Sequence, residues 1–159
     1  MADIAFLLLI FFLVATTIIS DQGIMVRLPP ITPGEPAPIP ERNVFSVKIN
    51  ASDALMAEGQ LAEAGDLRSM VRDFVLNPAR LPDLADAPNK AVISLQHDRA
   101  AHYERYIEVY NELVAAYREI WQQKALEIYG SPYDQLSDAA RKAIRKQIPM
   151  VISEAEYGN

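Results

Sequence analysis

The sequence predicts an α+β protein in which a single N-terminal transmembrane helix is joined by a proline-rich linker to a small domain. Three observations support this class. Residues 4–19 form an apolar run without charge, residues 28–40 are rich in proline, and the remainder alternates between strand-like and helix-like patterns. The 159 residues leave enough chain after the first two segments for one domain of ordinary size. We therefore divide the chain into a transmembrane helix at 1–20, a linker at 21–42 and an α+β domain at 43–159.

The apolar run is slightly short for a membrane span unless the residues before it are included. As a helix, residues 4–19 would rise about 24 Å, whereas the hydrocarbon core is about 30 Å thick. Extending the span to Met1 brings it near the usual length of about 20 residues and puts the Asp3 carboxyl group in the low-dielectric slab. Inserting a carboxylate into this slab costs about 2.5–3.5 kcal/mol, so such a group normally faces a protein or water-lined interior. Asp3 is therefore a candidate functional residue.

Three other interpretations of this segment remain open. A cleaved signal peptide would have basic residues before the run and a small-x-small site after it, and neither is present. A plain membrane anchor would hold Asp3 at the lipid headgroups if Met1 is the true start. A buried soluble helix is disfavoured because the segment is apolar all round and includes the pair Phe11 and Phe12.

Composition argues against several classes of function. The net charge of −6 and the pI near 4.9 disfavour nucleic acid as a partner, because no basic stripe is available to neutralise phosphates. The absence of cysteine excludes disulfides and thiolate metal sites, and it is compatible with an oxidising compartment. The two histidines, His97 and His102, offer little metal chemistry, and no Ser-His-Asp, metal or glycine-rich phosphate motif is present. We predict a protein that is not an enzyme and uses no metal or cofactor.

The proline-rich segment predicts an extended spacer. Residues 28–40 hold six of the 11 prolines, and each proline removes an amide donor and fixes φ. A chain of this kind is semi-rigid and rises about 3 Å per residue. The linker is therefore expected to hold the domain away from the bilayer.

The domain shows two repeating patterns. Apolar residues that alternate with polar ones predict half-buried strands, and apolar residues three and four apart predict amphipathic helices. Gly59, Asn77-Pro78 and Gly130-Ser131-Pro132 are expected to end elements. The predicted elements are strands at 45–49 and 54–58, a helix at 67–75, a strand at 91–96, helices at 100–129 and 137–147, and a strand at 150–153.

The two later helices carry distinctive side chains. In the long helix the apolar stripe contains four tyrosines, and these either lie at the core edge with hydroxyls in water or mark a surface for a partner. In the second interpretation, the distal part of the helix, including Trp121 and Ile128, forms the surface that packs on a partner. The short helix carries a basic cluster at 141–146, which we interpret as a solvated face that complements the helix dipole.

The beginning of the chain resembles a known family. The acid in Asp3-Ile4-Ala5-Phe6, with the leucine-rich run that ends in Val14-Ala15-Thr16-Thr17, looks like the transmembrane helix of the ExbD/TolR biopolymer-transport family. The resemblance implies a bacterial inner-membrane energiser that couples proton flow to mechanical work, with its N-terminus in the cytoplasm and its domain in the periplasm. It also implies a ββαβαβ order, to which this chain adds an extended helix and an extra short helix. Family members carry a short cytoplasmic segment before the acid, so we expect residues upstream of Met1 in the working protein.

The resemblance also implies partners. They are a second copy of the chain in a homodimer, a surrounding ring of ExbB-like multi-spanning membrane subunits, and a TonB-like periplasm-spanning protein that receives the force. In this scheme Asp3 carries the proton, and Thr16 and Thr17 at the end of the same run contact partners. A different class remains open, in which the chain is a membrane-anchored periplasmic binding or scaffolding module and Asp3 is incidental.

Three further residues match the family pattern of a strand that ends in Asp-Arg and a tyrosine that opens the next helix. They are Asp98, Arg99 and Tyr103, and the resemblance makes them candidates for partner binding. Each also has an ordinary structural interpretation, in which Asp98 caps the helix through its side chain, Arg99 pairs locally and Tyr103 begins the core stripe. We further expect the part from about Arg42 onward to fold alone and to self-associate weakly.

Overall fold

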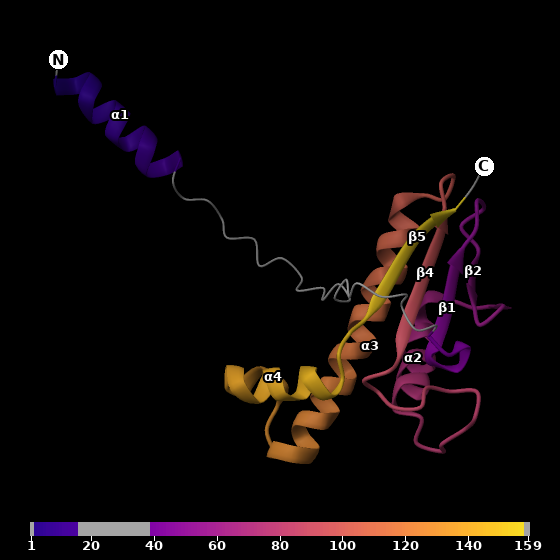
Figure 1. The fold of residues 1–159 in the computed structure, drawn as a ribbon. Helices are drawn as coiled ribbons and strands as arrows, with labels where there is room; N and C mark the ends of the chain where they lie inside the picture. The colour runs from indigo at the N-terminus through magenta and orange to yellow at the C-terminus, as the bar shows by residue number, and fades with distance from the viewer. Residues whose placement is uncertain (1, 16–38, 158–159) are drawn as a thin grey trace, which may run out of the picture.

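A computed structural model describes residues 2–15 and 39–157 of the chain. The described residues form a five-stranded sheet with helices, which confirms the mixed α+β class, and Figure 1 shows the sheet in front of helices. The elements are α1 (Ala2–Ala15), β1 (Val44–Ile49), β2 (Leu55–Ala57), β3 (Gln60–Leu61), α2 (Leu67–Leu76), β4 (Val92–Asp98), α3 (Tyr103–Tyr129), α4 (Asp138–Gln147) and β5 (Ile152–Tyr157), with 3-10 turns at Glu41–Asn43, Ala64–Asp66 and Tyr133–Gln135.

The strands lie in the order β3-β2-β1-β4-β5. β1 pairs antiparallel with β2 and parallel with β4, and β5 adds parallel to β4 at the edge. The sequence did not predict β3. Glu58 and Gly59 have φ angles of 51° and 77°, so the chain turns tightly after β2 and returns as a two-residue strand instead of entering a loop.

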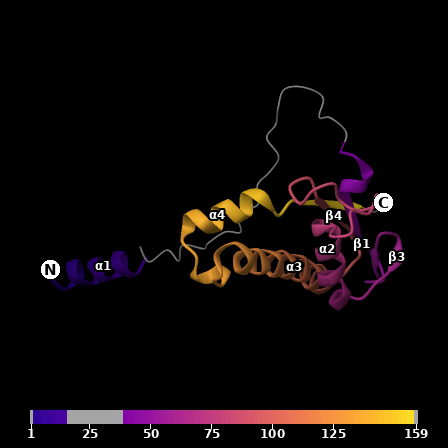
Figure 2. The same ribbon diagram turned by 90° about the horizontal axis from the view of Figure 1, so that it is seen from below.

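Only one face of the sheet is covered by described helices. Alternate residues of β1 and β4, such as Val47 and Leu95, are fully buried, and they pack in one cluster with Val71 of α2 and Leu113 of α3. The residues between them, such as Lys48, are more exposed. Figures 1 and 2 together show α2 and α3 on the same side of the strands. The alternation predicted for the first strand is therefore confirmed.

Most element boundaries lie within one residue of those predicted, and three elements differ by more. β4 extends two residues beyond 96, α3 begins at Tyr103 rather than at 100, and β5 covers 152–157 instead of 150–153. The error in β5 has a clear cause. After Ile152 every residue of the strand is exposed, so it lacks the apolar alternation that marks a half-buried strand and is held by its backbone pairing to β4.

Side chains of α3 also depart from the expectation that its tyrosines lie at the core edge. Tyr117 is fully buried, and burial raises the pKa of its hydroxyl group. Trp121, which was a candidate for partner contact, is used within the chain. Its Nε1 donates to the Ile148 carbonyl oxygen at 2.9 Å, and its ring stacks on Tyr133 at 5.7 Å between centroids. Ile128, by contrast, is 46% exposed.

The first helix, α1, is apolar on every side. Its described side chains run from Asp3 to Phe11 and are all exposed. At 14 residues, α1 is about 21 Å long. Within residues 2–15 and 39–157, no helix is long and apolar enough to cross a membrane. The end of the predicted span, residues 16–20, lies outside the described residues.

The loop between α2 and β4 is organised by one side chain. The helix α2 ends at Asn77 as predicted, and Asn77 adopts the left-handed conformation with φ of 38°. Its Nδ2 donates to the carbonyl oxygens of Leu81 and Ala85 at 3.0 Å each, and its Oδ1 accepts from the Leu81 amide at 2.7 Å. Asn77 is 8% exposed, so water does not replace these bonds easily.

We predict that Asn77→Ala lowers the free energy of unfolding by about 2–4 kcal/mol. The substitution leaves buried backbone groups without a hydrogen-bond partner, and alanine has no side-chain hydrogen bond to offset the cost of the left-handed conformation. Urea denaturation of the fragment 39–159 measures the change. Asn89→Ala is the matched control, since Asn89 is exposed in the same loop, and it should change the free energy by less than about 0.5 kcal/mol. Equal effects of the two substitutions would contradict the role of Asn77.

Candidate functional site

One end of the sheet brings together segments that are far apart in the sequence. Here the turn after β1, the β4–α3 connection and the end of β5 lie side by side, because Ile49 is in register with His97 and His97 with Glu156. We call this region the β4 corner and define it by Asp53, residues 98–103 and Tyr157. It contains the three candidate residues that follow the family pattern and lies at the top of the sheet in Figure 1.

Asp98 is the last residue of β4 and does not cap α3. Its Oδ1 accepts from the Ala100 amide at 2.8 Å, so it stabilises the turn that leaves the strand. The N-cap residue of α3 is His102. The prediction that Asp98 caps the helix is therefore wrong, because four residues separate the strand end from the helix start.

Arg99 and Tyr103 point to the surface of the β4 corner. Arg99 Nε lies 3.6 Å from Glu156 Oε2 on the neighbouring strand β5, so Arg99 pairs with a residue distant in the sequence and not locally as predicted. Tyr103 is 73% exposed, which makes the prediction that it begins the core stripe wrong. Among the described residues no hydrogen bond or ion pair joins Asp98, Arg99 and Tyr103 to one another. They share a surface without forming a bonded cluster.

The cap of α3 comes from the turn between β1 and β2. Asp53, with φ of 60°, accepts from the His102 amide through Oδ1 at 2.8 Å and holds its Oδ2 2.6 Å from His102 Nδ1. Arg105 Nε donates to the Asp53 carbonyl oxygen at 3.2 Å. Sequence reasoning missed this contact because the carboxylate and the helix it caps are about 50 residues apart.

The Asp53–His102 pair shifts the titration of both groups. Hydrogen bonds from the His102 backbone and ring lower the pKa of Asp53 below its usual 3.8. The hydrogen bond and the negative charge of Asp53 raise the pKa of His102 above its usual 6.5. The stability that the pair gains from protonated His102 is fully present below pH 6.5, and it is lost as pH rises through the raised pKa of His102. The stability that the pair gains from ionised Asp53 is fully present above pH 3.8, and it is lost as pH falls through the lowered pKa of Asp53.

Tyrosine hydroxyl groups connect β5 to α3 and to β1. Tyr106 donates its hydroxyl hydrogen to Glu154 Oε2 at 2.7 Å, and Tyr157 donates across β4 to the Ile49 carbonyl oxygen at 2.9 Å. Burial raises the pKa of Tyr106, and the hydrogen bond to Glu154 adds to the effect. Tyr106 is therefore a neutral donor at physiological pH. These bonds hold an edge strand whose side chains after Ile152 are all exposed.

The other candidate site is at the start of the chain. Asp3 is in the first turn of α1, and the eight residues that follow it are all apolar. A carboxylate near a helix N-terminus interacts favourably with the helix dipole. Thr16 and Thr17, the other candidates from this segment, lie outside the described residues.

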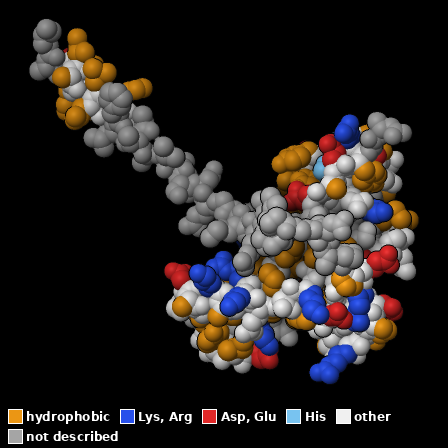
Figure 3. All heavy atoms as spheres, viewed as in Figure 1, with side chains coloured by type: hydrophobic (Ala, Val, Ile, Leu, Met, Phe, Trp, Pro, Cys, Tyr) orange, Lys and Arg blue, Asp and Glu red, His pale blue; other side chains and the backbone are white. Residues whose placement is uncertain are grey.

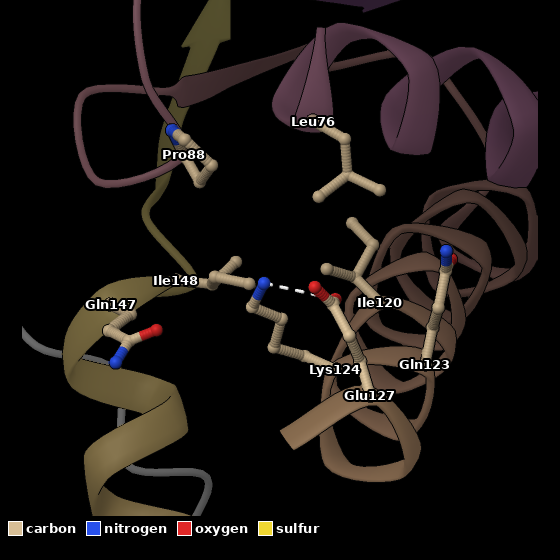
Figure 4. A pocket seen from close by; sticks show the side chains of 8 residues that line it. All are labelled: Leu76, Pro88, Ile120, Gln123, Lys124, Glu127, Gln147 and Ile148. Carbon is tan, nitrogen blue, oxygen red and sulfur yellow. Dashed lines mark hydrogen bonds and ion pairs between the residues drawn. The ribbon is translucent and has the colours of Figure 1, made fainter. Parts of the chain in front are cut away.

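A pocket lies where α2, α3 and α4 meet (Figure 4). Leu76, Ile120 and Ile148 give it an apolar wall, and an ion pair of 3.0 Å between Lys124 and Glu127 lies beside it. Nothing in its lining pairs a nucleophile with a base. Across the described part of the chain, no three His, Cys, Asp or Glu side chains are grouped so as to hold a metal ion. We interpret the pocket as a packing gap at the place where α4 contacts the rest of the domain.

These features define a class of protein in which an apolar helix with one acid in its first turn precedes a small α+β domain. The family model described as "Biopolymer transport protein ExbD/TolR" matches residues 1–120 of the chain. The chain therefore belongs to the ExbD/TolR family, a family of transport-associated proteins rather than enzymes. No curated protein matches the chain significantly. The end of α3, α4 and β5 lie beyond the matched residues.

We predict that the ring of His102 titrates above pH 6.5 and that Asp53→Asn lowers its pKa toward that value, because the substitution removes the charge and keeps the size of the partner. NMR titration of the histidine ring signals measures both. Asp66→Asn, at an exposed acid without a described side-chain bond, is the control and should leave the His102 titration unchanged. An identical titration in the wild type and in Asp53→Asn would show that the pair does not form in solution.

Proposed function

We propose that the protein is the proton-motive-force-coupled energiser subunit of an ExbB-ExbD-TonB-type complex in the bacterial inner membrane, where it powers outer-membrane transport. The observation that carries the proposal is the family match, which includes both Asp3 and most of the domain. In this scheme residues 1–20 span the membrane once, residues 21–42 are the linker and residues 43–159 are the periplasmic domain. The N-terminus is cytoplasmic.

Asp3 is proposed to carry the proton. A carboxyl group in a low-dielectric medium favours its neutral form, and water or a polar partner favours its charged form. One acid can therefore take up and release a proton as its surroundings alternate. Each charge that crosses a potential of about 100 mV releases about 2.3 kcal/mol, so several protons suffice for a conformational step.

The proposed partners follow the same scheme. Two copies of the chain form a homodimer within a ring of ExbB-like subunits, and Thr16 and Thr17 contact these neighbours near the end of the span. The β4 corner is proposed to contact the TonB-like protein, because Arg99 and Tyr103 are exposed there beside the edge strand β5. Force generated at Asp3 would then reach the partner through the linker and the domain.

We predict that Asp3→Asn abolishes uptake of a transport-dependent ligand while expression, membrane insertion and assembly stay normal, since Asn keeps the size and removes the titration. Asp3→Glu keeps a carboxyl group and should retain part of the uptake. Uptake by cells that carry each variant at wild-type protein levels is the measurement. Asp83→Asn, an equal charge change at an exposed loop residue, is the control and should transport normally. Uptake at the wild-type rate in Asp3→Asn would favour the anchored binding or scaffolding module instead.

A further inference from the structure

The outer side of α4 carries four cations: Arg141, Lys142, Arg145 and Lys146. The spacing i, i+1, i+4 and i+5 places them on one side of the helix, which we call the α4 basic face. The other side is fixed to the domain, because Ile144 and Ile148 are 1% and 3% exposed. Figure 3 shows blue side chains gathered over the lobe that α4 forms in this view.

Most of the charge on the α4 basic face is uncompensated. Elsewhere in the domain exposed cations commonly face a carboxylate, as Arg42 does with Asp86 at 2.9 Å. In the described part of the chain, Arg141 pairs with Asp138, but Lys142, Arg145 and Lys146 form no ion pair. These three unpaired cations lie within five residues of one helix on a chain whose net charge is −6.

The shape of the α4 basic face favours a plane of negative charge as its partner. Lys142, Arg145 and Lys146 are all exposed, and the helix carries no aromatic side chain among its ten residues that would anchor a protein partner. An anionic lipid surface attracts a polybasic helix without needing a pocket, and each basic residue near it contributes about fivefold to binding. A solvated face that only complements the helix dipole would not need Lys142, which lies a turn before the C-terminus.

We propose that the α4 basic face docks the domain onto the anionic phospholipid surface of the membrane that holds α1. The inference rests on the proposed function only in taking α1 as the membrane anchor. Residues 21–40, the part of the linker before the turn at Glu41–Asn43, would span at most about 70 Å if fully extended, so the linker permits both a docked domain and a domain far from the bilayer. Tethering raises the effective concentration of the lipid surface at α4, so individually weak charge contacts suffice for docking.

Docking gives α4 a role that the family match does not assign, since the helix lies beyond residues 1–120. Docking through α4 holds the domain at the bilayer, and release from the lipid lets the linker carry it outward. The strength of docking then sets how often the domain is free to reach a distant partner.

The test uses the full chain in nanodiscs and a fluorophore on α4. The chain has no native cysteine, so Ala139→Cys, at an exposed residue of α4, gives a single labelling position. Energy transfer to an acceptor on lipid headgroups reports how close α4 lies to the bilayer. We expect high transfer in nanodiscs with about 30% phosphatidylglycerol, low transfer in phosphatidylcholine alone, and loss of transfer in about 1 M salt, where the screening length falls to about 3 Å.

The decisive variant is Lys142→Gln/Arg145→Gln/Lys146→Gln. Three losses of about fivefold each lower the docking constant roughly 100-fold.

The matched control is Lys48→Gln/Arg80→Gln/Arg118→Gln. It makes the same change in net charge at exposed cations that are scattered over β1, a loop and α3 and form no ion pair in the described residues. The control should keep docking within about twofold of the wild type, because it removes no charge from α4.

Three results would overturn the proposal. They are equal transfer in anionic and neutral nanodiscs, wild-type transfer in the α4 variant, and binding of the α4 basic face to isolated cell-wall glycan in preference to lipid.

A chain that is recovered without lipid would instead contradict the anchor in the proposed function. Sedimentation of the full chain with anionic vesicles then decides the docking. The wild type must bind these vesicles, and the α4 variant must not.

Discussion

The burial of a single face of the sheet is the constraint on which the rest of this structure depends. β1 and β4 present fully buried residues to one side, and α2 and α3 lie over that side as the connections between parallel strands. The ring contact between Phe45 of β1 and Phe74 of α2, at 5.2 Å between centroids, belongs to this layer. Because β1, β4 and β5 run parallel, their C-terminal ends meet at one end of the sheet. That end forms the β4 corner.

The helix α3 is longer than covering the sheet requires, and this length determines where the added elements lie. Leu113 and Tyr117 are buried in the core, whereas Ile128 and Tyr129 at the far end are 46% and 43% exposed. Trp121 marks the transition, since it bonds to Ile148 and so ties α3 to the end of α4. Residues beyond the family match therefore extend the core while leaving the basic side of α4 at the surface.

The sequence predicted what depends on local pattern and missed what depends on distant contacts. Alternation identified β1, and helical spacing with the stop at Asn77 identified α2, because both signals lie within a few residues. The cap that Asp53 gives to α3 and the exposed strand β5 have no local signature, since one is a contact across the fold and the other is held by backbone pairing. Asp3 stood out in the sequence because a single acid before an apolar run is chemically conspicuous.

The central claim is that Asp3 moves protons, and proton flux tests it most directly. Proteoliposomes that contain the full chain with the proposed multi-spanning partner and a trapped pH indicator would be given a membrane potential of about 100 mV, which supplies about 2.3 kcal/mol per charge. The account predicts flux in the wild type and in Asp83→Asn, and none in Asp3→Asn. Undiminished flux in Asp3→Asn, with the complex intact, would contradict the account.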